Sequence, residues 1–463
     1  MKIHCLVLLL LLVGGCAVGP DFKAPREKVP ANWTGLANVN TNTNAASFAN
    51  SSPAQLKAWW NKFNDPTLNE LIDEAFRTNL DLQMAESRLR QARASRGIVA
   101  GPFYPSLNAN GSYARQWAVH TNNNYFAAGL DAAWELDIWG GTRRNIESAN
   151  ANILAARESL HDAQVTLAAE IALDYIQLRA AQEQIDIADN NLKSERRTAA
   201  LTRQRLAAGF VSALDVANAE AQAATTASAI PVLETTARQN IYALSVLLNR
   251  LPGDLVEQLS KNGPVPLTPP EVPVGLPSDL VRRRPDIRVA EAQWHAATAQ
   301  IGVAKSDLFP QFSLTGGVNY QSDLARTLFA GSSRLWTVGP SVNWPIFQGG
   351  SIAANVRLQK ALSQQAAITH RQTVLQALEE VENALIAFAK EWDHRQALTE
   401  AVTQNRRAVD LSMQLYTQGT TDFLSVLDAQ RSLYVSENAL SQSKASISTD
   451  LVALYKALGG GWE

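Results

Sequence analysis

The feature that most constrains the fold is a run of 67 residues, Thr142–Ala208, that contains neither glycine nor proline. The run is rich in Ala, Leu, Ile, Gln, Glu and Arg, most of which are strong helix formers. As one α-helix, with a rise of about 1.5 Å per residue, it extends for about 100 Å, several times the length of an ordinary globular helix. No compact domain encloses such a rod, so this helix needs partners along its whole length.

Apolar residues recur in this run at intervals of seven, interrupted by one step of four. They are Ile146, Ile153, Leu160, Leu167, Ile171, Leu178, Ile185, Leu192, Ala199 and Leu206. A steady seven-residue period with one slip is typical of a long coiled coil. We therefore expect the helix to pack against other helices as a coiled coil.

The chain contains a second run of this kind, Ser351–Gln418, and each run begins after a Gly-Gly pair. The two runs end at Gly209 and Gly419, and each is followed by a shorter helical segment. Upstream, residues 79–105 match residues 284–310 at seven of 27 positions at a constant offset of 205, whereas about two matches would be expected by chance. The sequence therefore predicts an internal two-fold repeat, with a helical hairpin in each half.

The N-terminal 16 residues have the pattern of a secretion signal. Lys2 precedes an apolar run, Cys5–Val13, which is far shorter than the roughly 20 residues of a spanning helix. Val13–Cys16 resembles a bacterial lipobox, which implies cleavage before Cys16 and acylation of that cysteine; an ordinary signal peptide with a chance cysteine is the alternative. No other cysteine remains in the mature chain, which excludes an internal disulfide and a cysteine-based metal cluster.

Composition and hydropathy narrow the class of protein further. The 41 Lys and Arg residues are balanced by 43 Asp and Glu residues, which argues against a nucleic-acid-binding protein. No later apolar run is long enough for a transmembrane helix, so we expect any membrane span to be a β-strand.

The apolar period changes from helical to two after Pro105 and again after Pro310. Four segments then alternate apolar and polar residues, at about 105–117, 125–138, 311–321 and 335–345. A half-buried sheet in a soluble protein would alternate in the same way, but strands of about ten residues with Trp and Tyr towards their ends favour strands that span lipid. Pro340 lacks an N–H group, so we expect a bulge or a gap there.

Four strands cannot close a barrel. An open four-stranded sheet in lipid would leave two edges of unpaired backbone groups, at a cost on the order of tens of kcal/mol. We therefore expect several protomers to share one barrel. Two copies would give eight strands, and three would give twelve strands and room for a lumen; the residue pattern leaves both open.

The predicted organisation follows from these segments. It consists of a signal peptide (1–15), a lipidated extended leader (16–56), a first repeat (57–250) with a long helix (142–208) and a return helix (212–250), a Pro-rich linker (251–277), a second repeat (278–458) with a long helix (351–418) and a return helix (422–458), and a C-terminal tail (459–463).

Several short motifs occur in order along nearly the whole chain. They are Gly15–Asp21, Trp59-Trp60 with Asp65-Pro66, Leu276–Arg288, Phe309-Pro310, Trp344–Phe347 with Gly349-Gly350, Tyr416–Gly419 and Val426–Leu433. With these motifs the chain resembles the outer membrane efflux protein family of TolC-type channels, and most closely its lipoprotein branch that serves resistance-nodulation-division pumps.

The resemblance implies a mixed α and β membrane protein in the outer membrane of a Gram-negative bacterium. Three chains would form a homotrimer with a 12-stranded outer-membrane β-barrel, four strands per chain, continued by a long periplasmic α-helical coiled-coil barrel. The resemblance also implies passive export of drugs or other small molecules. An inner-membrane resistance-nodulation-division transporter and a periplasmic adaptor (membrane fusion protein) would deliver them.

The hairpin ends are the expected position of a periplasmic gate. Ser212–Asp215 is a capping-box pattern, and Asp422–Ser425 is its equivalent in the second repeat. In the family, acidic residues at these ends line the closed aperture, and an aromatic and a basic residue help to hold some members shut. Matching these motifs gives the candidate gate residues Asp215, Tyr416, Thr421, Ser425 and Asp428. Thr421 and Ser425 depart from the charged versions, which argues against a gate locked by charge, and capping alone explains Asp215, so Asp428 is the stronger candidate.

Three other functions fit the sequence less well than a channel. The histidines are scattered, and no nucleophile elbow, P-loop or nucleotide fingerprint occurs, so we expect no enzyme activity, cofactor or metal site. A non-conducting, lipid-tethered periplasmic coiled-coil scaffold would lack strands with a lipid-facing alternation. A type I secretion channel is disfavoured because the lipobox points to the pump-associated branch.

Overall fold

The computed structural model describes residues 17–25, 28–34, 47–49, 56–118, 121–266, 271–273 and 277–462. The predicted signal peptide and Cys16 lie outside these residues. The chain forms two compact units, and each unit takes equivalent pieces from both repeats. The first unit comprises residues 1–27, 86–159 and 286–373, and the second comprises residues 28–85, 160–285 and 374–463. No helix among the described residues is long and apolar enough to cross a membrane.

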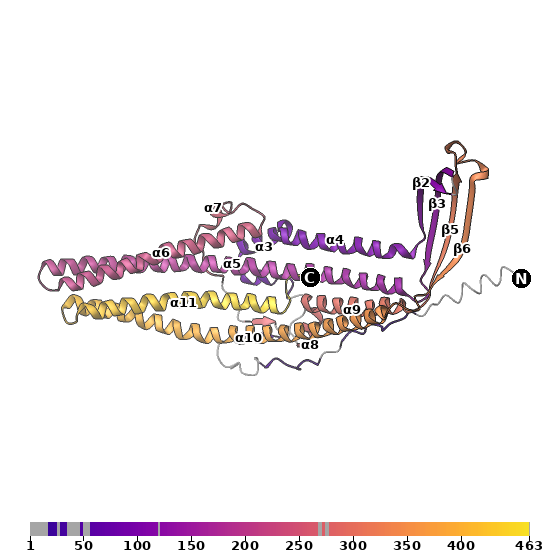
Figure 1. Cartoon of the computed structure of the whole chain (residues 1–463). Coiled ribbons are helices and arrows are strands. Elements are labelled where there is room, and N and C mark those ends of the chain that lie inside the picture. Colours follow the sequence, from indigo (N-terminus) through magenta and orange to yellow (C-terminus); the bar gives the residue numbers. More distant parts are fainter. Residues whose placement is uncertain are drawn as a thin grey trace. The chain divides into compact units, whose positions relative to one another are not determined.

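The first unit contains one antiparallel sheet of four strands in the order β2-β3-β5-β6 (Figure 1). The strands are β2 (Ser106–Ala118), β3 (Thr121–Leu136), β5 (Gln311–Ser322) and β6 (Arg334–Asn343). The β3 strand begins four residues before the predicted start, so the connection from β2 is shorter than expected. Within the chain, β2 and β6 are the two edges of the sheet.

The strand register gives the sheet one apolar and one polar face. Leu130, Val318 and Trp336 lie opposite one another on β3, β5 and β6, so their side chains form one apolar row. On the opposite face, the Asp131 carboxylate accepts a hydrogen bond from the Asn319 amide at 3.3 Å. Large apolar side chains of this sheet are exposed, including Leu107, Trp117, Leu130, Val318, Trp336, Val338 and Val342. The first unit therefore presents an uncovered apolar sheet face.

The register through Pro340 is continuous. Pro340 pairs directly with Leu314, and its neighbours pair in sequence with Thr315 and Ser313. Our expectation of a bulge or a gap at this proline is therefore wrong. Because β6 is an edge strand in the chain, one missing N–H group does not interrupt the ladder.

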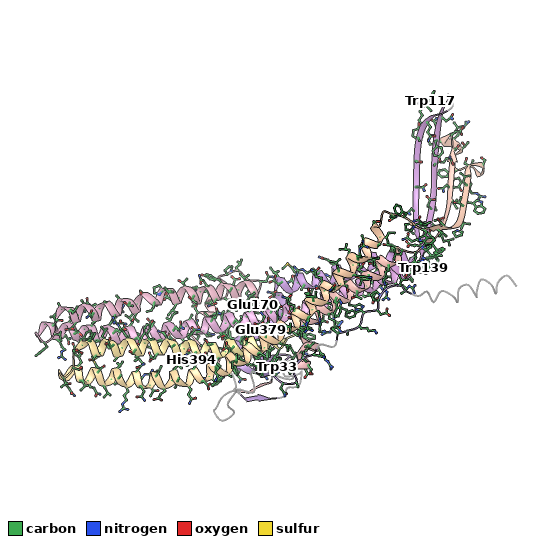
Figure 2. The ribbon with its side chains drawn as sticks, turned by 60° about the horizontal axis from the view of Figure 1, so that its bottom comes forward. Trp33, Trp117, Trp139, Glu170, Glu379 and His394 are labelled. Atoms are coloured by element: carbon green, nitrogen blue, oxygen red, sulfur yellow. The ribbon has the colours of Figure 1, made fainter. Side chains whose placement is uncertain are left out.

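The two-fold repeat is visible in matching contacts at the base of the sheet. The Trp134 indole N–H donates to the carbonyl of Phe103 at 3.1 Å. The Trp344 indole N–H donates to the carbonyl of Leu308 at 3.2 Å. Each tryptophan thus ties the end of its strand to the segment that precedes the other strand of the same hairpin. Figure 2 places Trp117 at the end of the sheet away from Trp139, which follows β3.

The first described residues of the leader, 17–25, contact other segments of the first unit. The Asp21 carboxylate and the Arg144 guanidinium form an ion pair at 2.6 Å. The Phe22 ring stacks on the His295 ring, with centroids 4.5 Å apart and planes 11° from parallel. These contacts fix residues 21 and 22 to the start of α5 (Gly141–Ala207) and to α9 (Pro285–Ser306).

The helices range from single turns to α5 and α10, which have 67 and 68 residues. They are η2 (Trp59–Phe63), α3 (Pro66–Thr78), α4 (Leu80–Ala100), η3 (Gly101–Phe103), α5 (Gly141–Ala207), α6 (Ala213–Leu247), α7 (Val256–Leu259), α8 (Pro277–Arg283), α9 (Pro285–Ser306), η4 (Ala325–Thr327), η5 (Gly331–Ser333), α10 (Ser351–Gln418) and α11 (Phe423–Ala457). Helix α7 lies in the Pro-rich linker, and the strands β1 (Ser47–Ala49) and β4 (Glu271–Pro273) form a short parallel pair.

The core of the second unit joins the start of the first repeat to the end of the second. The rings of Trp59 and Tyr455, both fully buried, stack with centroids 5.2 Å apart. Asp65 caps α3 by accepting the N–H groups of Thr67 and Leu68. Its other carboxylate oxygen accepts the Tyr175 hydroxyl at 2.8 Å, which links α3 to α5. This core therefore connects helices of the two repeats.

Candidate gate at the hairpin ends

Two helical hairpins make up the second unit beyond this core. Helix α6 returns alongside α5, and α11 returns alongside α10 (Figure 1). The turns contain Gly209 and Gly419, whose φ angles are +77° and +74°. Only glycine adopts this left-handed conformation readily, which is why the long helices end there.

The acidic residues directly after each turn cap the return helices. The Ser212 N–H donates to the Asp215 carboxylate at 2.9 Å, and the Asp215 N–H donates back to the Ser212 hydroxyl at 3.3 Å. In the second hairpin, Asp422 accepts the hydroxyl of Ser425 at 2.8 Å and its N–H at 3.1 Å. These hydrogen bonds from Ser425 lower the pKa of Asp422. Capping therefore accounts for both aspartates.

Asp428 differs from these capping aspartates. It lies one turn further along α11, is exposed, and makes no hydrogen bond or ion pair with any described residue. The Thr421 hydroxyl, by contrast, donates to the Ser425 hydroxyl oxygen at 3.2 Å. Of the predicted gate residues, Asp428 is thus the carboxylate with no structural partner.

Tyr416 lies in the interface between the two hairpins. Its side chain is only 1% exposed and packs in a cluster of buried residues. The other members are Ala199, Ala219, Phe423, Val426 and Leu427. Its ring centroid is 5.7 Å from that of Phe423. Tyr416 therefore joins the hairpin ends by packing, and its hydroxyl finds no hydrogen-bond partner in the described part of the chain.

Arg205 is a residue at this site that the sequence analysis missed. Its guanidinium lies 4.4 Å from the centroid of the Tyr416 ring, and its Nη1 donates to the Tyr416 carbonyl. The heptad pattern placed Leu206 in the helix interface, but Leu206 is 37% exposed and Arg205 packs inwards instead. The sequence carried no signal for this residue, because the burial of Thr198, seven residues earlier in α5, is known only from the structure.

A buried polar group lies further from the ends. The Glu195 side chain is 2% exposed, and its Oε1 accepts the Gln222 amide and the Thr226 hydroxyl, each at 3.0 Å. Oε2 of Glu195 finds no hydrogen-bond partner among the described residues. Burial raises the pKa of Glu195 above its usual value, against the lowering effect of these hydrogen bonds and of nearby Arg431.

Within the described ranges, no three His, Cys, Asp or Glu side chains are grouped so that they could hold a metal ion. The described residues instead form a four-stranded sheet and two long helical hairpins. A four-stranded sheet with an exposed apolar face and two open edges, on a chain with two long helical hairpins, defines a protein of the outer-membrane channel class.

Comparison with known proteins gives the family. The family model for the outer membrane efflux protein matches residues 71–250 and 276–460, one range in each repeat. The chain belongs to this family, and it is an efflux channel component of the bacterial outer membrane.

Relatives and solved structures are similar over nearly the whole chain. Nodulation protein T of Rhizobium leguminosarum bv. trifolii is 32% identical over 459 residues, covering 98% of this chain and 96% of the relative. The toluene efflux pump outer membrane protein TtgC of Pseudomonas putida is also 32% identical, covering 99% and 95%. The structure of the outer-membrane channel OprN is 36% identical, with a TM-score of 0.89, covering 96% and 100%. These matches favour the channel over a tethered scaffold.

Proposed function

We propose that three copies of this chain form the exit duct of a tripartite efflux system. The duct would receive small molecules from an inner-membrane resistance-nodulation-division transporter through a periplasmic adaptor and release them passively outside the cell. In this assembly the three sheets form one twelve-stranded barrel in the outer membrane. Cys16 would carry the lipid anchor.

The observation that carries this proposal is the sheet. Its edge strands β2 and β6 have no further strand beside them in the described chain, and its apolar face is exposed. In lipid each unpaired backbone group costs several kcal/mol, so two open edges of about ten residues cost tens of kcal/mol. Pairing β2 of one copy with β6 of the next removes both edges and closes the barrel.

The names of the relatives support passive export with the cargo selected elsewhere. Relatives of about 30% identity are named for toluene efflux, cation efflux and pyoverdine export. Such different cargo argues for a wide duct rather than a specific binding site. We therefore infer that the pump, and not this chain, selects the exported compounds.

The gate is proposed at the hairpin ends, with Asp428 as its acidic residue and Asp215, Tyr416, Thr421 and Ser425 holding the ends in shape. A related channel, MtrE of Neisseria gonorrhoeae, is described in an open state; it is 28% identical, with a TM-score of 0.82. We infer that the present chain also alternates between a closed and an open arrangement of these ends.

One pair of variants tests the barrel directly. Val318 lies on the apolar face of β5, and Thr337 lies on the polar face of β6. An arginine facing lipid near the bilayer midplane costs about 2–4 kcal/mol per chain, whereas an arginine facing a water-filled lumen costs little. Val318→Arg should abolish the heat-modifiable oligomer and the conductance in planar bilayers, and Thr337→Arg should keep both. A wild-type protein that is monomeric and non-conducting would refute the proposal.

A further inference from the structure

Polar contacts join the two hairpins at intervals of seven residues along α5. They connect Gln184 to Gln442 at 3.2 Å, Asn191 to Glu437 at 2.9 Å, and Thr198 to Gln430 at 3.0 Å. All three partners lie on α11. The next position in this series is Arg205, at the end of α5.

Arg205 differs from the earlier members of the series in charge and in partner. Arg205 is positively charged, whereas Gln184, Asn191 and Thr198 are neutral. It contacts Tyr416 in the last turn of α10 instead of a side chain of α11. The Tyr416 carbonyl also accepts the N–H of Gly419 in the turn, at 3.0 Å. Carbonyl groups in the last turn of a helix lack helical partners and carry the negative end of the helix dipole, so a guanidinium is favoured there.

We propose that Arg205 is the latch residue of the gate. Its guanidinium, held between the ring and the carbonyl of Tyr416, ties the end of α5 to the end of α10, and its release lets the two hairpin ends separate. This inference rests on the proposed function, in which the hairpin ends form the gate of an efflux duct. The residue that holds the ends together lies on the first hairpin. Its position is none of the motif positions 215, 416, 421, 425 and 428.

The surroundings of Arg205 explain why one residue can act as a latch. The buried face of α5 near its end carries Thr198 and Thr202, and the apolar residue Leu206 points towards solvent. A hydrogen bond formed on folding replaces one that the same groups make with water in the unfolded chain, so each such contact contributes little net stability. The packing between the two hairpin ends therefore depends on the small Tyr416 cluster and on the Arg205 guanidinium beside the Tyr416 ring.

The test compares variants of the full chain in planar bilayers. Arg205→Leu keeps part of the side-chain packing but removes the charge and the donors. We expect it to raise the open-to-closed ratio about tenfold, which corresponds to about 1.4 kcal/mol. Arg205→Gln should raise the ratio similarly and serves if the leucine variant does not assemble. An unchanged ratio in the assembled variants would overturn the proposal.

A matched control separates the latch from a general effect of surface charge. Arg203 lies two residues away and pairs with Glu220 of its own hairpin at 2.7 Å, so Arg203→Leu should leave the ratio unchanged. A rise in Arg203→Leu equal to that in Arg205→Leu would assign the effect to surface charge and refute the latch. If the wild type itself never conducts, the proposed function fails; if it conducts and Arg205→Leu does not alter it, only the latch fails.

Discussion

Replacing Glu195 by glutamine is expected to stabilise the protein near neutral pH. One oxygen of the buried carboxylate accepts hydrogen bonds from Gln222 and Thr226, and the other has no hydrogen-bond partner among the described residues. A buried polar group left without a partner costs about 1–3 kcal/mol, and more when it is charged. Glutamine keeps the paired oxygen and puts a neutral amide nitrogen in place of the charged, unpartnered oxygen; because a neutral group costs less to bury than a charged one, we expect a gain of about 1 kcal/mol.

The sign of the pH dependence follows from the raised pKa of Glu195. The native state holds the proton at pH values where the unfolded chain, with its ordinary pKa of 4.5, has already lost it. Wild-type stability therefore falls as the pH rises from 4.5 through the raised native pKa. The glutamine variant has no proton to lose at this position, so its advantage should be small at or below pH 4.5 and complete above the native pKa.

Thermal unfolding followed by circular dichroism in detergent measures this difference. A gain of 1 kcal/mol raises Tm by about 2–4 °C in a domain of about 200 residues. Glu195→Ala leaves the donors of Gln222 and Thr226 buried without an acceptor, so it should lose about 2–4 kcal/mol at or below pH 4.5 and less above the native pKa, where wild type itself is destabilised. Glu220→Gln, which alters an exposed ion pair, should change stability by less than about 1 kcal/mol. A glutamine variant less stable than wild type near neutral pH, or a gain independent of pH, would refute the reasoning.

Three further predictions concern other parts of the chain. Asp428→Ala should raise single-channel conductance or lower cation selectivity in planar bilayers, and unchanged values of both would reject its role in the gate. Gly19→Val should release the leader, because the φ angle of Gly19 is +109° and a Cβ atom there would lie 2.5 Å from the Gly302 Cα. We expect trypsin to cleave the leader faster in this variant, and a wild-type cleavage rate would contradict this. Arg288→Met removes the 2.9 Å ion pair with the buried Glu158 and should cost about 1–3 kcal/mol in a denaturant titration, less than for a fully buried pair because the Arg288 side chain is 35% exposed; a loss within error of zero would contradict this.

The sequence by itself determined the elements that local rules govern. A run without glycine or proline has no residue at which a helix would stop, so the long helices α5 and α10 lie within one residue of their predicted bounds. Gly209 and Gly419 mark the turns because the left-handed conformation is costly for other residues. Alternation with a period of two gave the four strands, since successive side chains of a strand point to opposite faces.

The tertiary structure decided which residues face one another across the hairpins. The heptad pattern favours Leu206 in the interface because it counts apolar residues along one helix. The neighbouring helices determine which side of α5 is buried, and at its end that side carries Arg205. Pro340 is a similar case, since only the strand order shows that it lies on an edge strand, where a missing N–H group is tolerated. The spacing of residues along one chain sets the period of a pattern, but the position of a distant partner sets which side of it is used.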